Sequence, residues 1–319
     1  MSNDSDVAAT VSHAYGVMTV VDTALRLGIL DRLNQGPATV SEIARELSLD
    51  THSLEVLLRA LGAIGVVQPT SKGDGGAEQG YRAGYTQVDM SRQWSGLDER
   101  LRHGRSQRRL DTPDEAAVYY PHSVGILGEQ MAPPAAVAAE HLVAKKPSTI
   151  LDLGAGAAPW SRAISGRLAE CKVTAVDLPP VLEVTRAAAT ESKVESQYRF
   201  VPGDVFSVDL DEGHYDLCVL GMICHLFDGP TNRRLIARAA RALKPGGHLA
   251  IFESLPDHSD PLAVALYELD LLLRTTDGGL HTLAAYSSWL RDEGFDAPER
   301  LELGGQITLL TAHKPRPTV

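Results

Sequence analysis

Two carboxylates and two glycines in the middle of the chain have the types and spacing of a ribose-binding site. Asp152 precedes Gly154 and Gly156, after a short apolar run and before an alanine-rich stretch. Where a strand turns tightly into a helix, glycines let the backbone approach a ligand closely because they lack a Cβ atom. Asp177 ends the next apolar run, where its carboxylate can accept hydrogen bonds from both ribose hydroxyls.

Other positions favour a ligand without phosphate. The third glycine of a dinucleotide-binding turn would stand where this chain has Pro159, and no P-loop lysine accompanies the turn. A third apolar run ends in a segment that offers a carboxylate and an aromatic face for an adenine: Asp204, Val205 and Phe206. We therefore expect an adenine-containing ligand rather than a dinucleotide.

At these segments the chain resembles the class I S-adenosylmethionine-dependent methyltransferases. More narrowly, it is similar to the small-molecule O-methyltransferases of plant caffeate and flavonoid metabolism and of bacterial natural-product tailoring. Val176–Leu182, Gly203–Phe206 and Ile223–Asp228 are similar to the family's Asp-Leu-Pro, Gly-Asp-Met-Phe and His-Asp-Trp-x-Asp motifs, in the same order. The resemblance implies O-methylation of a phenolic hydroxyl on a small aromatic secondary metabolite. S-adenosylmethionine would become S-adenosylhomocysteine, with no metal.

The resemblance also implies roles for single residues. The expected cofactor-binding residues are Asp152, Gly154, Gly156, Asp177, Leu178, Asp204, Val205, Phe206 and Gly221. His225 follows the fourth apolar run, at the sheet edge where ligands bind in such folds, and it matches the family's general base. Glu253 ends the fifth run and matches the glutamate that orients this imidazole. The alternatives are that His225 merely caps a strand end and Glu253 a loop.

Several residues differ from the plant pattern. They are Leu226 in place of aspartate, Phe227 in place of tryptophan, Gly221 in place of a lysine near the cofactor, and Ala158 in place of the last glycine of the turn. A second glutamate, expected after Gly278-Gly279, is missing, and His281 lies close by. Either His281 substitutes for it or the acceptor needs no strong base. The alternative functions are therefore C- or N-methylation on the same scaffold, or a cofactor-dependent rearrangement without methyl transfer.

The fold that must position these residues is a Rossmann-like α/β domain. The expected strands are 150–153, Lys172–Asp177, Tyr198–Pro202, Tyr215–Leu220, His248–Glu253 after a turn at Lys244–Gly247, and Ile307–Ala312. Helices are expected over Ala157–Leu168 and before Asp292–Phe295. The family's sheet has seven strands with helices on both faces, and its last two strands pair antiparallel.

The N-terminal third predicts a winged helix. Its expected elements are a helix within Gly16–Leu33, a helix from the capping box Thr39–Glu42 to about Leu47, a helix with the stripe Leu54–Leu61, and strands Ile64–Val67 and Tyr81–Thr86 around the tip Lys72–Gly80. Acidic residues outnumber basic ones up to Arg105, so DNA binding by this region is disfavoured. In the family that the chain resembles, this domain forms the homodimer interface and helps to close the partner's active site.

We expect three regions: residues 1–105 as an α-helical winged-helix dimerisation domain, 106–147 as a helical linker over the substrate cavity, and 148–319 as the S-adenosylmethionine-binding catalytic domain. The linker is apolar over Ala116–Leu142 and is interrupted by Pro121 and Pro133-Pro134. The expected substrate contacts are Tyr119, Tyr120, Met131, Met222 and His281. For the linker residues among them, plain core packing is an equal alternative.

Composition agrees with a cytoplasmic enzyme. The chain has 319 residues, enough for two domains, and 44% of them are apolar. No run approaches the roughly 20 apolar residues of a membrane span, and the first residues are polar and acidic rather than a signal peptide. Cys171, Cys218 and Cys224 lack metal-ligand spacing and fit buried thiols in a reducing compartment. The net charge of −11 argues against nucleic acid as a partner.

Overall fold

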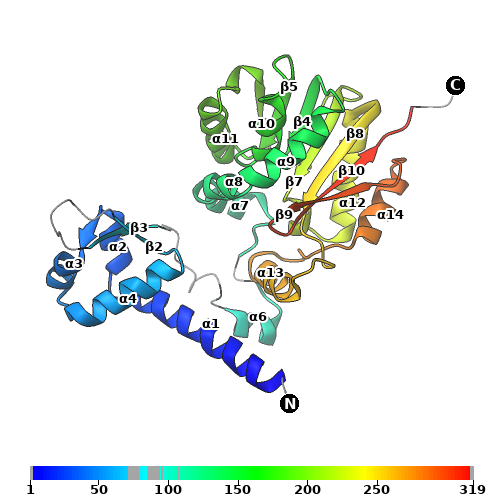
Figure 1. Cartoon of the computed structure of the whole chain (residues 1–319). Helices are drawn as coiled ribbons and strands as arrows, with labels where there is room; N and C mark the ends of the chain where they lie inside the picture. Colours follow the sequence, from blue (N-terminus) through cyan, green and yellow to red (C-terminus); the bar gives the residue numbers. More distant parts are fainter. Residues whose placement is uncertain (1–2, 71–78, 85–93, 95, 107, 317–319) are drawn as a thin grey trace. The chain divides into compact units, whose positions relative to one another are not determined.

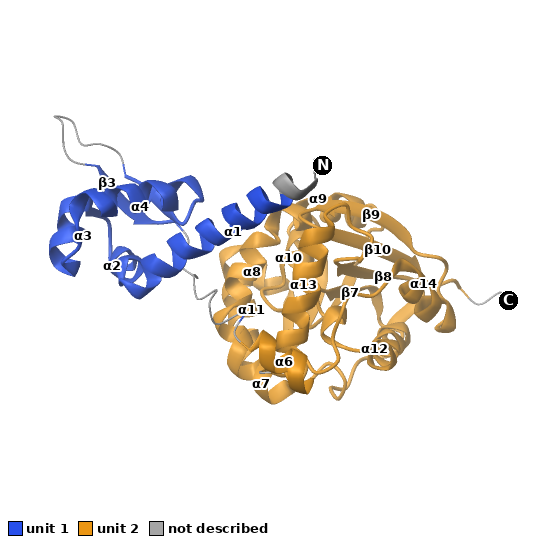
Figure 2. Ribbon diagram, turned by 90° about the horizontal axis from the view of Figure 1, so that it is seen from below, with its two compact units in different colours: residues 1–95 blue, residues 96–319 orange. Residues whose placement is uncertain are grey.

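The chain divides into two compact units in the computed structural model, which describes residues 3–70, 79–84, 94, 96–106 and 108–316 (Figure 1). The N-terminal unit is Met1–Ser95 and the C-terminal unit is Gly96–Val319 (Figure 2). Most of the predicted glycine-rich tip and the end of the second predicted wing strand lie outside the described residues. None of the described helices is both long and apolar enough to cross a bilayer.

The described residues of the N-terminal unit form helices and a small antiparallel sheet of strand order β1-β3-β2. The elements are α1 (Asn3–Arg26), α2 (Ile29–Asn34), β1 (Ala38–Thr39), α3 (Val40–Leu47), α4 (Thr51–Ala63), β2 (Val67–Pro69) and β3 (Gly80–Ala83). The capping box is confirmed, since the Glu42 N–H donates to Thr39 Oγ1 and the Thr39 N–H donates to Glu42 Oε2.

Two details of the predicted winged helix were wrong. The stretch Gly16–Leu33 is not one helix, because Gly28 adopts a left-handed φ of 72° and separates α1 from α2. The first wing strand begins at Val67 rather than Ile64. The N–H groups of Ile64 and Val66 still donate to carbonyls of α4, so these residues close the helix instead of pairing in the sheet.

The C-terminal unit is built on a seven-stranded sheet of order β6-β5-β4-β7-β8-β10-β9. The strands are β4 (Thr149–Leu153), β5 (Lys172–Asp177), β6 (Tyr198–Pro202), β7 (Tyr215–Gly221), β8 (Leu243–Glu253), β9 (Glu299–Gly304) and β10 (Ile307–His313). Strands β4 to β8 pair in parallel, whereas β10 pairs antiparallel with both β8 and β9. The predicted α/β fold and its antiparallel end are therefore confirmed.

One predicted turn lies inside a strand. Tyr215 of β7 pairs with Leu243 of β8, and Leu217 pairs with His248. The segment Lys244–Gly247 of β8 therefore stands opposite the single residue Asp216 of β7 and forms an irregularity in the pairing. Gly246 accommodates this irregularity with a φ of 89°. Strand β8 therefore starts at Leu243, five residues before the predicted start.

Helices cover both faces of this sheet. They include α10 (Pro159–Ser165), α11 (Pro179–Glu191), α12 (Gly229–Ala242), α13 (Pro261–Arg274) and α14 (Leu283–Asp292). Helices α12 and α14 pack into one apolar core with β7 and β8, and α10 packs into a second core on alternate residues of the same strands. Helix α10 is shorter than predicted at both ends. Ala158 has a left-handed φ of 52°, so the helix begins only at Pro159, and it ends at Ser165, after which the N–H groups of Arg167 and Leu168 donate to carbonyls three residues back in a turn.

The predicted linker consists of short helices. Within 106–147 they are α7 (Pro113–Tyr119), the 3-10 turn η1 (Tyr120–His122), α8 (Val124–Gln130) and α9 (Ala132–Val143), and α6 (Leu97–His103) precedes them. Pro121 lies in the 3-10 turn, whereas Pro133-Pro134 stands in the first turn of α9, where proline is tolerated. Leu142 and its α9 neighbours are buried in the core with α10, so α9 is part of the sheet-packed structure.

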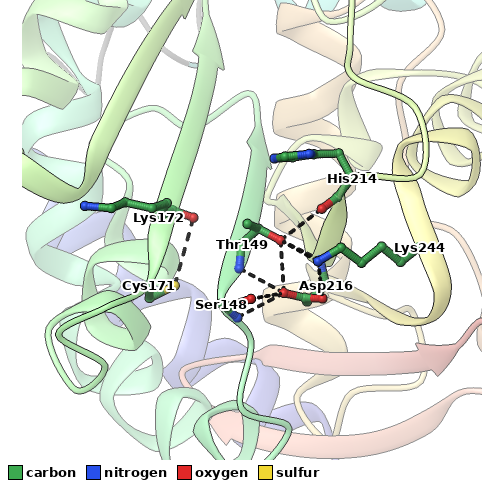
Figure 3. A network of polar contacts seen from close by, with 7 residues as sticks. All are labelled: Ser148, Thr149, Cys171, Lys172, His214, Asp216 and Lys244. Atoms are coloured by element: carbon green, nitrogen blue, oxygen red, sulfur yellow. Dashed lines mark hydrogen bonds and ion pairs between the residues drawn. The ribbon is translucent and has the colours of Figure 1, made fainter.

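The amino ends of the central strands are tied together by Asp216 of β7 (Figure 3). Its carboxylate accepts hydrogen bonds from the N–H and hydroxyl groups of Ser148 and Thr149, and it pairs with Lys244 Nζ at 2.7 Å. Strands β4, β7 and β8 thus share one carboxylate at the edge opposite to the predicted ligand site.

Candidate active site

The turn after β4 has a backbone conformation and a close neighbour that require glycine. Gly154 and Gly156 have φ values of 71° and 55°. A Cβ on Gly154 would lie 2.4 Å from Ile223 Cδ1, and the Gly154 N–H donates to the Val176 carbonyl at 2.9 Å. The turn is therefore held against β5, and Ile223 leaves no room for a side chain at position 154.

Asp177 lies at the end of β5, beside this turn. One carboxylate oxygen accepts a hydrogen bond from the Gly156 N–H at 2.8 Å, and the other accepts from the Leu178 N–H at 2.7 Å. Burial raises the pKa of Asp177 to about 6. Because each carboxylate oxygen has two lone pairs, both can still accept a ribose hydroxyl. Asp177 therefore shapes the turn and is also available to a ligand.

Asp152 is buried beneath the turn and only partly hydrogen-bonded. Its Oδ2 accepts from the Ser161 hydroxyl at 2.5 Å, and Ser161 Oγ lies 2.9 Å from the Tyr198 hydroxyl. Among the described residues, Asp152 Oδ1 has no partner, and burial raises the pKa of this carboxyl to about 7. Such an orphaned buried oxygen fits a ligand donor such as an ammonium group.

Ser161 and Tyr198 were not identified from the sequence. A polar residue inside the apolar face of α10 was the available signal for Ser161. Nothing in the sequence connects Tyr198, which lies 37 residues further on, to the same carboxylate.

The predicted adenine segment is held in place by short contacts. Asp204 Oδ1 accepts a hydrogen bond from the Phe206 N–H at 3.1 Å, and the Val205 carbonyl accepts one from Arg238 Nε at 2.8 Å. The Phe206 ring packs edge-on against Phe227, with ring centroids 5.1 Å apart. Phe227 therefore supports the aromatic face expected to meet an adenine.

His225 and Glu253 meet at the carboxyl ends of β7 and β8. His225 Nδ1 lies 2.9 Å and 3.1 Å from the two Glu253 carboxylate oxygens, and the His225 N–H also donates to Oε1. The two residues are 4% and 1% exposed. A carboxylate at Nδ1 selects the tautomer with the proton on that nitrogen, which leaves Nε2 to accept a proton. The predicted pair is thus brought together in the orientation that a general base needs.

Gly221 has a steric role that the sequence did not reveal. A Cβ at this position would lie 2.4 Å from the Trp160 ring, which stacks on Phe252 with centroids 3.9 Å apart. A lysine there would displace this stack. The neighbouring Met222 adopts a φ of 56°, and its N–H donates to the Phe252 carbonyl. Whether Gly221 and Met222 also touch ligands stays a prediction.

His281 contacts the backbone of the turn that follows β7. Its Nε2 lies 2.8 Å from the Phe227 carbonyl oxygen, and its ring packs against Trp289 at 5.0 Å. The Gly279 N–H donates to the His225 carbonyl at 2.9 Å. These contacts brace the backbone that carries His225, and they lend no support to His281 as a substitute for the missing glutamate beside the imidazole.

Among the predicted linker contacts, Tyr120 and Met131 have different surroundings. Tyr120 is partly buried, its ring packs edge-on against Tyr119 at 5.5 Å, and burial raises its pKa to about 12. Met131 packs on the apolar core shared by α9 and α10. A tyrosine that the sequence did not single out, Tyr267 of α13, places its ring 5.6 Å from the His225 imidazole. Within the described residues, no cluster of three or more His, Cys, Asp or Glu side chains could hold a metal ion.

Comparison with known proteins agrees with this geometry. Residues 135–296, just over half of the chain, match the model of the O-methyltransferase domain, and residues 10–94 match the O-methyltransferase dimerisation domain. The dimerisation-domain match supports a homodimer.

Two characterised relatives extend over most of the chain. The tetracenomycin polyketide synthesis 8-O-methyltransferase TcmO of Streptomyces glaucescens is 25% identical, covering 98% of this chain and 97% of its own length. The 3-hydroxy-5-methyl-1-naphthoate 3-O-methyltransferase of Streptomyces sahachiroi is 26% identical, covering 85% and 84%.

The fold is shared with solved structures. Human N-acetylserotonin methyltransferase in complex with S-adenosylmethionine has a TM-score of 0.74 at 24% identity, covering 98% of this chain and 99% of that one. The orphaned Asp152 oxygen and the Asp177 carboxylate beside the glycine turn fit S-adenosylmethionine. The chain therefore belongs to the O-methyltransferase family and is an S-adenosylmethionine-dependent O-methyltransferase with an N-terminal dimerisation domain.

Proposed function

We propose that the enzyme methylates a phenolic hydroxyl on a small aromatic metabolite, with His225 as general base. The observation that carries the proposal is the buried pair in which Glu253 binds His225 Nδ1 and leaves Nε2 to take a proton. TcmO and the naphthoate 3-O-methyltransferase, by their names, act on a polyketide and on a hydroxynaphthoate. An aromatic acceptor for this chain is in keeping with both.

When bound, S-adenosylmethionine supplies an electrophilic methyl group. The glycine turn and Asp177 would hold its ribose, and Asp152 Oδ1 would receive its ammonium group. His225 Nε2 takes the phenolic proton as the oxygen attacks, and Glu253 stabilises the imidazolium that results. Such proton transfer is typically worth about 10²–10⁴ in rate.

Leu226 and Phe227 occupy the positions of the family's acidic and indole residues. Leu226 is 7% exposed and belongs to the apolar core, and Phe227 packs against it. These side chains exclude water near His225 and offer no second acid or base. His225 and Glu253 therefore carry the acid–base work in this proposal.

The test is S-adenosylhomocysteine formation from a panel of phenols, amines and electron-rich arenes. Turnover of phenols, with the methyl group found on oxygen, is the expected result. Turnover restricted to amines or to ring carbons would instead favour N- or C-methylation on this scaffold.

We also propose that an apolar stripe on α1 is buried in the homodimer. Val7, Val11, Tyr15 and Met18 recur at helical spacing and are 55%, 62%, 75% and 45% exposed in the single chain. Obligate dimer interfaces bury about 2,000 Å² or more and are apolar. Light scattering at micromolar concentration should give twice the chain's mass, and Val11→Glu should shift the population toward monomer. A wild-type monomer would contradict the proposal.

A further inference from the structure

A group of aromatic and cationic side chains extends from His225 along α13. The Tyr267 ring lies 5.6 Å from the imidazole, and the Arg274 guanidinium carbon lies 5.7 Å from the centre of the Tyr267 ring. Arg274 is also close enough to Tyr119 and Tyr120 for their charges to interact. The imidazole and the guanidinium are thus both neighbours of the same aromatic ring.

One donor of Arg274, the buried Nε–H group, has no hydrogen-bond partner among the described residues. Its Nε lies 2.7 Å from Asp270 Oδ2, and the two side chains are 19% and 12% exposed. The two atoms form an ion pair, but the Nε–H group does not point at the Asp270 oxygen as a hydrogen bond requires, so the buried Nε has no hydrogen-bond partner among the described residues. A guanidinium carries five N–H donors in a planar fork, and leaving such donors unsatisfied away from water is costly. An oxyanion of the acceptor would satisfy them.

Tyr120 connects this group to the cofactor side of the site. The charges of both Arg274 and Asp177 act on its phenol, and its ring packs against that of Tyr119. Burial raises the pKa of Tyr120 to about 12 and that of Tyr267 further still, so both phenols keep their protons. The Tyr267 hydroxyl and the Arg274 cation therefore belong to one group that begins at His225, and Tyr120 adds a second hydroxyl on which the Arg274 charge acts.

We propose that Arg274, together with Tyr267 and Tyr120, binds an acidic group on the acceptor, so that the preferred substrate is an aromatic acid whose hydroxyl faces His225. The inference rests on the proposed O-methylation and names its acceptor class. The Asp270 carboxylate lies beside Nε, so an acceptor carboxylate would meet the two terminal nitrogens of the fork. A carboxylate can then be bound in the bidentate manner that distinguishes arginine from lysine.

The experiment compares matched acceptors that differ only in charge, 3,4-dihydroxybenzoate and 3,4-dihydroxybenzamide, and the corresponding pair built on 3-hydroxy-2-naphthoate. The wild-type enzyme should have a higher kcat/KM for each acid than for its amide. Arg274→Met should lower the acid-to-amide ratio at least about 10-fold, the scale of a lost charge-assisted pair. Arg274→Lys should lose part of the preference because it keeps the charge and loses the fork.

Arg108→Met is the matched control. Arg108 lies over the Tyr119 ring at 5.1 Å but is exposed, so its removal should leave the acid-to-amide ratio unchanged. If Arg274→Met does not fold, the acid-to-amide ratio of kcat/KM is measured in Arg274→Gln and Tyr267→Phe instead, and it should fall in both. S-adenosylhomocysteine affinity must stay at the wild-type value in each variant.

A binding measurement separates this inference from the proposed function. Calorimetric titration of each acid and amide into the enzyme saturated with S-adenosylhomocysteine needs no turnover. Preferential binding of the acids that Arg274→Met abolishes would support the site even if no phenol were methylated. Equal affinity of the wild-type enzyme for acid and amide, or an equal effect of Arg274→Met on both, would overturn it.

Discussion

Aspartates at the amino ends and at the carboxyl ends of the central strands have opposite surroundings. At the amino edge, partial burial of Asp216 is outweighed by donors from Lys244, Ser148 and Thr149, which hold its pKa well below the usual range. At the carboxyl edge, burial raises the pKa of Asp177 to about 6 and that of Asp152 to about 7.

The difference lies in the number of protein donors. Asp216 is saturated and joins three strands, whereas Asp152 keeps one buried oxygen without a partner among the described residues. A saturated carboxylate stabilises the fold, and an unsaturated one is reserved for a ligand. Substitutions at the amino edge should therefore cost stability, and substitutions at the carboxyl edge should cost function.

The largest effect is expected at His225. His225→Ala should lower kcat about 10²-fold or more because the acceptor loses its base, while S-adenosylmethionine affinity stays near the wild-type value. The increase of the reaction rate with rising pH should also be absent in this variant. The control is His214→Ala, an exposed histidine at the amino edge, which should keep full kcat. A His225→Ala enzyme with most of its activity would mean that positioning alone drives the reaction.

Asp216→Ala should destabilise the protein by about 2 kcal/mol, because the N–H groups of Ser148 and Thr149 lose their shared acceptor. Urea unfolding measures this, and kcat of the folded fraction should be unchanged. A large loss of kcat with full stability would remove the distinction between the two edges.

Asp177→Ala should weaken S-adenosylmethionine binding by at least about 1.5 kcal/mol, the scale of a charge-assisted hydrogen bond. Part of this loss will come from the Gly156 N–H, which the carboxylate also holds. Calorimetric titration is the measurement, and Asp216→Ala, which should bind the cofactor normally, is its control. Unchanged affinity in Asp177→Ala would remove the ribose assignment.

The smallest effect is a pH dependence of stability. Because the pKa of Asp152 is raised from 3.8 to about 7, the folded state binds this proton more tightly than the unfolded state. The resulting stabilisation is complete below about pH 4 and is lost as the pH rises through 7. Without cofactor, the unfolding free energy should fall by about 1 kcal/mol more in wild type than in Asp152→Asn between about pH 6 and 7.5. Parallel pH profiles would contradict the carboxyl's burial.

Much of the fold could be predicted because its signals are local. Strands β5 and β6 have the predicted bounds, and the Thr39 capping box is present as predicted, since apolar runs and caps involve neighbouring residues. The meeting of His225 and Glu253 followed from topology. The carboxyl ends of adjacent parallel strands must lie at one edge, so two strand-end residues become neighbours.

Contacts between elements that are distant in the sequence were decided only by the tertiary structure. The Ser161–Tyr198 support of Asp152, the Trp160 ring that requires Gly221, and the bracing of the turn by His281 each depend on how helices pack on the sheet. The sequence by itself determined the glycine turn and most of the central strands, because these need only local pattern and strand order, and the resemblance of its motifs to the methyltransferases gave the cofactor class. The side chains that surround the acceptor, Arg274 among them, are selected by packing across the sheet edge, and no periodicity encodes that choice.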